Sequence, residues 1–151
     1  MNSLYSILVI AHILSAIIGI GPGFILTTLV KTAQTMDQVR YVFAIKYRLH
    51  RFVRTGGILL LATGLLLGAV NPFLFQQGWF LLSLFLYLIV LILGVTLLKT
   101  YTRPIRQMIA DLNIKEIPSS YYHARNKLLR TEYIVNLLII VIILLMITKP
   151  F

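Results

Sequence analysis

One histidine lies inside a long apolar stretch of this sequence. By its type and position it is the best candidate in the chain for a chemical role. His12 follows Leu4 by eight residues, in a stretch without acidic or basic side chains before Lys31. Ionisable residues inside membrane segments are costly, face the protein interior and usually serve a function. An imidazole there can bind a haem iron, or it can hydrogen-bond across a helix bundle while serving only packing. Both interpretations remain open.

Small side chains follow His12 at helical spacing. Ser15, Ala16 and Gly19 come three, four and seven residues later, so in a helix they share its face. Such a strip makes room for a flat cofactor or lets another helix cross closely. In the third apolar stretch, Ser83 and Tyr87 are the expected inward polar groups. We predict a cofactor-binding site with His12 as haem iron ligand, formed by His12, Ser15, Ala16, Gly19, Ser83 and Tyr87.

The sequence lacks the residue sets of several other chemistries. It contains no Cys, which excludes disulfides, thiolate zinc sites and covalent c-type haem attachment. All four acidic residues fall in predicted inner loops or at a helix start, so no intramembrane carboxylate is expected. His50 is expected more than about 20 Å from His12 along the membrane normal, so the two cannot bind one iron. Catalytic residues are not identified.

Four apolar stretches must position these residues. The composition is 59% hydrophobic and only 12% charged, which is too apolar for a soluble domain of 151 residues. Each stretch approaches the roughly 20 residues that a helix needs to cross a bilayer. We therefore predict an all-α fold, a four-transmembrane-helix bundle in one domain, residues 1–151. The expected helices cover about 4–30, 37–75, 79–112 and 120–147.

The basic residues predict the orientation. Nearly all of them fall in the loops 31–56 and 99–132, whereas the N-terminal tail and the turn 76–78 carry no charge. Positive residues in short loops stay on the cytoplasmic side, so both termini should face outward and both long loops inward. The net charge of +10 is therefore a signal of topology, and no nucleic-acid partner is expected.

The two inner loops are expected to carry helical extensions. In the first loop, apolar residues at helical spacing alternate with basic and aromatic residues. Such a face suits the headgroup layer, where basic groups meet anionic lipid. It is either a specific lipid-headgroup site or an ordinary juxtamembrane collar. The residues predicted to contact headgroups on the cytoplasmic face are Arg40, Lys46, Arg48, Arg51 and Arg54. In the second loop, Ser119 or Ser120 is the expected cap of the fourth helix.

The segment Ala11–Gly21 resembles the first helix of a loose group of small bacterial four-helix membrane proteins. The group includes the copper-resistance D proteins, the small four-helix membrane protoporphyrinogen oxidases and uncharacterised integral membrane families. The chain is most similar to the uncharacterised members, a domain of unknown function. The resemblance continues in order through Tyr47-Arg48-Leu49, Thr55-Gly56-Gly57, Thr63-Gly64, Gly78-Trp79 and Arg130.

This resemblance implies a role for His12. In the oxidase relatives a first-helix histidine and a third-helix lysine are implicated in haem binding and activity. His12 matches that histidine, but the lysine position falls on Ser83 and a later histidine position falls near Gly94. The resemblance therefore argues against the oxidase activity. It implies haem b or porphyrin binding through His12, with a different second ligand or an open face.

We expect a multi-pass protein of a bacterial plasma membrane, and three functions remain open for it. The first is redox chemistry or haem handling, with haem b or a porphyrin as the only cofactor. The second is a small transport component with a polar path through Ser15, Ser83, Tyr87 and Asn136. Since so few polar residues make a poor monomeric pore, this function requires a homo-oligomer. The third is a non-catalytic module that binds lipid or a partner membrane protein.

Overall fold

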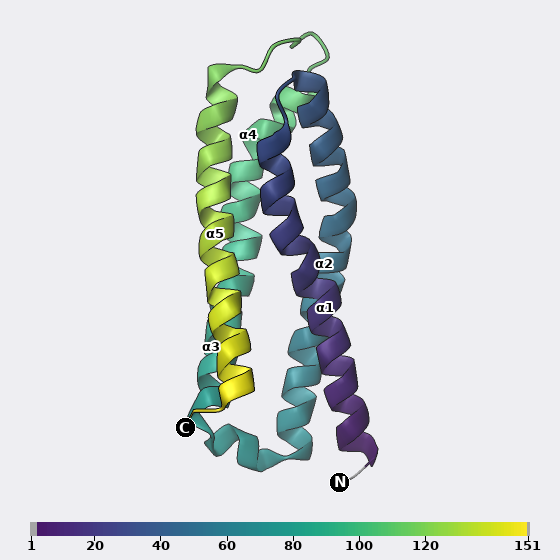
Figure 1. Cartoon of the computed structure of the whole chain (residues 1–151), viewed down its shortest axis with the longest axis vertical. Coiled ribbons are helices and arrows are strands. Elements are labelled where there is room, and N and C mark those ends of the chain that lie inside the picture. The colour runs from purple at the N-terminus through teal and green to yellow at the C-terminus, as the bar shows by residue number, and fades with distance from the viewer. Residues whose placement is uncertain (1–2, 151) are drawn as a thin grey trace.

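Four long helical segments run side by side along the molecule (Figure 1). The computed structural model describes residues 3–150, so Met1, Asn2 and Phe151 of the predicted domain lie outside the described residues. The third long segment is continuous but passes through a π-helical stretch, η2. In chain order, the elements are α1 (Ser3–Thr32), α2 (Met36–Val70), η1 (Pro72–Gln76), α3 (Gly78–Leu93), η2 (Gly94–Leu98), α4 (Lys99–Ala110) and α5 (Ser119–Thr148).

All four segments are long and apolar enough to cross a membrane, which confirms the predicted all-α membrane fold. They contain 30 to 35 residues each. At about 1.5 Å per residue they measure about 45–52 Å, which exceeds the roughly 30 Å of the hydrocarbon core. Each segment therefore extends out of the bilayer, as the predicted helical extensions require.

The links between the helices are short, and local sequence sets their positions. Only residues 33–35 join α1 to α2, where Thr35 and Gln38 form a reciprocal capping box with two bonds of 3.3 Å. The second helix ends at Val70 rather than at residue 75, because Pro72 lacks an N–H and disfavours helical backbone at Asn71. α5 begins at Ser119 with Pro118 as its cap, instead of a serine.

The two ends of the bundle are packed differently. We call the end with the α1–α2 and α4–α5 links the inner end, and the opposite end the outer end (Figure 1). Near the inner end all four segments contribute to one core cluster of buried side chains. The cluster consists of Val30, Ala33, Met36, Val39, Val42, Phe43, Ile105, Tyr121, Leu128 and Leu129.

Toward the outer end the bundle separates into two pairs, α1 with α2 and α3 with α5. The first pair crosses closely where Gly19 meets Gly56. A Cβ on Gly19 would lie 2.8 Å from the backbone carbon of Gly56 and the backbone nitrogen of Gly57. Glycine on both helices therefore permits this approach, as in other membrane helix pairs. α1 continues as a helix through Pro22, three residues beyond the crossing.

We expect Gly19→Ala to destabilise the protein by about 1–3 kcal/mol, because its methyl group would press against the backbone of α2. The matched control is Gly21→Ala in the same helix, since a Cβ at Gly21 meets no atom within 4 Å. The free energy of unfolding of the detergent-solubilised protein, followed by circular dichroism, measures the difference. Equal stability of the two variants would contradict the close crossing.

Candidate functional site

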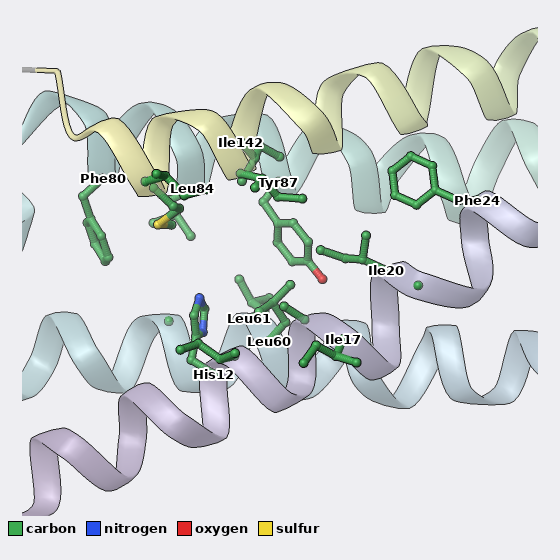
Figure 2. A pocket seen from close by; sticks show the side chains of 17 residues that line it. His12, Ile17, Ile20, Phe24, Leu60, Leu61, Phe80, Leu84, Tyr87 and Ile142 are labelled. Carbon is green, nitrogen blue, oxygen red and sulfur yellow. The ribbon is translucent and has the colours of Figure 1, made fainter.

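His12 projects from α1 toward α2 and toward the space between the two helix pairs (Figure 2). Its Nδ1 lies 2.8 Å from the Oγ1 of Thr63, and that hydroxyl donates to the carbonyl oxygen of Leu59 at 2.7 Å. Since the hydroxyl proton is used in this second bond, Oγ1 accepts a hydrogen bond from the N–H at Nδ1. The Nε2 of a neutral His12 therefore keeps a free lone pair, the form in which histidine binds metals.

A cavity of about 670 Å³ lies beside His12, between the two helix pairs of the outer half. It is lined by 17 residues, of which only His12 and Tyr87 carry polar side chains. Its volume and apolar lining are typical of sites for small organic ligands and cofactors. The lining residues Ile13 and Ile17 of α1 and Ile147 of α5 are more than half exposed. The cavity therefore opens between α1 and α5, toward the lipid.

Small residues beside His12 make room in the cavity. Ala16 lines the wall one turn after His12, and Gly64 lines it on α2. A Cβ on Gly64 would lie 3.3 Å from the Cε1 of His12, so a larger residue there would press on the imidazole ring. The wall on α3 includes Phe80, Leu84 and Tyr87 (Figure 2).

The structure brings together three of the six predicted cofactor residues: His12, Ala16 and Tyr87 line the cavity. The other three do not. Ser15 is buried and donates to the carbonyl oxygen of Ala11 at 2.7 Å, while Gly19 packs against α2. Ser83 is fully buried on α3, outside the cavity lining. The strip of small residues thus divides between ligand space and close helix packing, because its members point to different sides of α1.

The four residues of the suggested transport path do not share one passage. Only Tyr87 lines the cavity, and its hydroxyl donates to the carbonyl oxygen of Gly57 at 2.8 Å. Asn136 donates instead to the Oγ1 of Thr27 at 3.3 Å, nearer the inner end. The cavity therefore favours an apolar ligand over a polar path.

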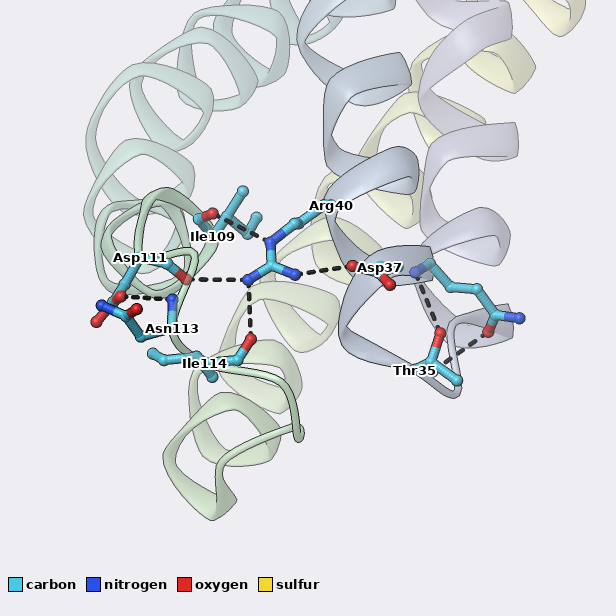
Figure 3. Close-up of polar contacts among 8 residues, drawn as sticks. Thr35, Asp37, Arg40, Ile109, Asp111, Asn113 and Ile114 are labelled. Atoms are coloured by element: carbon cyan, nitrogen blue, oxygen red, sulfur yellow. Dashed lines mark hydrogen bonds and ion pairs between the residues drawn. The ribbon is translucent and has the colours of Figure 1, made fainter.

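Two of the basic residues predicted to contact headgroups are engaged within the protein. Arg40 donates to the carbonyl oxygens of Asp111 at 2.9 Å and Ile114 at 2.8 Å, and it pairs with Asp37 (Figure 3). A further bond reaches the carbonyl oxygen of Ile109 at 3.4 Å, so Arg40 caps the end of α4. Its side chain therefore joins α2 to the α4–α5 link.

Lys46 forms a buried ion pair with Glu132 between α2 and α5, and both side chains are only 10% exposed. Glu132, which the sequence assigned to the loop 99–132, thus lies within α5 and is buried between helices, whereas the expectation of no carboxylate within the membrane stays a prediction. The remaining headgroup candidates, Arg48, Arg51 and Arg54, are exposed on α2. Their contact with lipid headgroups stays a prediction.

Over residues 6–150, the sequence matches the model of a family described as "Predicted integral membrane protein (DUF2269)". The chain belongs to this family. The expected membership of an uncharacterised membrane family is thereby confirmed, and the protein is a multi-pass integral membrane protein. The comparisons do not support the more distant similarity to copper-resistance D proteins or protoporphyrinogen oxidases. No curated protein and no solved structure matches the chain.

The sequence-based interpretation missed two residues of the cavity region. Thr63 was noted only as part of a motif, although it is the hydrogen-bond partner of His12. With the end of α2 at Val70, counting residues from the outer end places Thr63 and His12 at similar depth. Met146 lines the cavity on α5, but a single methionine among aliphatic residues gave no signal in the sequence.

We expect Lys46→Met to destabilise the protein by about 3–5 kcal/mol, because Glu132 would be left buried without its cationic partner. Adding Glu132→Gln removes the second charge and should restore most of the lost stability. The control is Arg48→Met, which removes an exposed cation two residues away. Thermal unfolding in detergent checks all three. A single variant as stable as the wild type would contradict the buried pair.

Proposed function

We propose that this protein binds haem b or a related porphyrin in the outer cavity, with the Nε2 of His12 as ligand to the iron. The observation that carries the proposal is an imidazole at the wall of an otherwise apolar cavity, with its Nδ1 hydrogen-bonded to Thr63 so that Nε2 is left for a ligand. Metal-binding histidines usually donate their other N–H to a fixed acceptor, the role that Thr63 plays here.

The surroundings of His12 also fit a flat macrocycle. Apolar side chains supply almost the whole lining, and Ala16 and Gly64 leave the imidazole unobstructed by bulky neighbours. The opening toward lipid gives an apolar ligand a route from the bilayer. A bound haem would supply one-electron redox chemistry, or it would be held as cargo in haem handling. The contribution of this chain is to bind the iron, orient His12 and exclude water.

We further propose that the protein lies in a bacterial plasma membrane, with its inner end in the cytoplasm. The argument is the distribution of charge, since the basic residues concentrate toward the inner end and Lys149 alone stands at the outer end. In this orientation Arg48, Arg51 and Arg54 lie close to the cytoplasmic headgroups, where anionic lipid favours them.

We expect His12→Ala to abolish haem binding, because it removes the iron ligand and leaves an apolar wall. The measurement is the absorption spectrum of purified protein, oxidised and dithionite-reduced, before and after addition of haem. The wild type should show a Soret band and reducible visible bands. The control His123→Ala, which removes an exposed imidazole outside the cavity, should give the same spectrum as the wild type. A wild type that stays colourless after haem is added would refute the proposal.

We expect Thr63→Val to weaken haem binding by about 10–100-fold, because the isosteric change removes the acceptor that holds the Nδ1 proton of His12. Thr55→Val is the matched control, since the Thr55 hydroxyl bonds only carbonyl oxygens of its own helix, those of Arg51 and Phe52. Haem titrations in detergent give both affinities. Equal affinities for the two variants would show that the hydrogen bond does not orient the ligand.

A further inference from the structure

The cavity holds one more side chain with a donor atom suited to iron. Among its 17 lining residues, only His12, Tyr87 and Met146 carry a nitrogen, oxygen or sulfur atom in the side chain. The Tyr87 hydroxyl is already directed at α2, where it donates to the carbonyl oxygen of Gly57 at 2.8 Å. The Met146 thioether has no such engagement, and it packs among the aliphatic side chains that join α3 and α5.

Met146 and His12 belong to opposite helix pairs. Figure 2 shows Ile142 of α5 across the cavity from His12 of α1. Met146 follows Ile142 by four residues, so it lies on the same face of α5, one turn closer to the outer end. Both residues line the cavity, His12 from the α1–α2 pair and Met146 from the α3–α5 pair. A ligand held between the pairs therefore meets an imidazole on one side and a thioether on the other.

The depths of the two residues also correspond. At the outer end α1 begins farther out than α5 ends (Figure 1). Met146 lies two residues before the end of α5 and His12 lies nine residues after the start of α1, and both line the same cavity in the outer half. Methionine has three rotatable bonds and a polarisable sulfur, so its side chain adjusts to a ligand more easily than the isoleucines around it.

We propose that the Met146 thioether is the second axial ligand of a haem held by His12, an inference that rests on the proposed function. Histidine and methionine together are a known axial pair, and methionine raises the reduction potential of the iron. A haem held by both residues would have no open site for small molecules. It would supply one-electron transfer and not the activation of a substrate at the iron.

Met146→Leu tests this assignment in the full-length protein loaded with haem b. The wild type should give a low-spin, six-coordinate spectrum and should not bind carbon monoxide when reduced. Met146→Leu should keep its haem through His12, become high-spin, bind carbon monoxide and show a lower midpoint potential. The control is Met108→Leu, which removes a thioether that packs against the inner core cluster and should leave the spectrum unchanged.

The possible failures are distinguishable. A wild type without haem overturns the proposed function and this inference together. A haem that is high-spin in the wild type, or unchanged in Met146→Leu, overturns the methionine ligand alone. If Met146→Leu loses its haem, Met146→His decides between ligation and packing. A low-spin spectrum with a lowered potential in Met146→His supports ligation, and absence of haem from that variant overturns it.

Discussion

The structure depends on where water can drive helices together. Apolar burial stabilises packing only for surfaces that would otherwise meet water, and inside lipid that driving force is absent. The helices are longer than the bilayer is thick, so their inner ends can form a core like that of a soluble protein. Within hydrocarbon, close contact between helix backbones requires small residues, and Gly19 and Gly56 supply it between α1 and α2. The outer halves of the two pairs are therefore free to enclose a cavity.

Polar groups are distributed according to the same constraint. In the outer half few polar side chains bond between elements, His12 with Thr63 and Tyr87 with the backbone of Gly57, and the buried Ser83 hydroxyl has no partner among the described residues. Toward the inner end the structure uses charges, with Lys46 paired to Glu132 and Arg40 bound to the end of α4. The ion pair and the Arg40 contacts link α2 to the second half of the chain, so the inner end determines how the two helix pairs face each other.

Much of the fold could be predicted from the sequence, because hydropathy and charge patterns report directly on membrane crossing. The end of α2 was misplaced, since apolar residues after Pro72 continue the hydropathy signal although the backbone leaves the helix there. The site was predicted less completely. A helical period shows that Ser15, Ala16 and Gly19 share roughly one side of α1, but not which of them meets α2 and which meets the cavity. The same limit concealed Thr63 and Met146, because their roles depend on pairing between distant helices.

The polar contacts that join α1 and α5 near the inner end also affect how a ligand can enter the cavity. The polar contacts between α1 and α5 lie toward the inner end, where Asn136 donates to Thr27 and Lys31 stacks over Tyr133. Beside the cavity these two helices instead present exposed isoleucines, so widening the opening breaks no hydrogen bond between them. An apolar ligand can thus enter from the bilayer while the inner core stays intact. If His12 and Met146 both bind the iron, the ligand would link α1 to α5, in addition to the bond between Tyr87 of α3 and the backbone of Gly57 on α2.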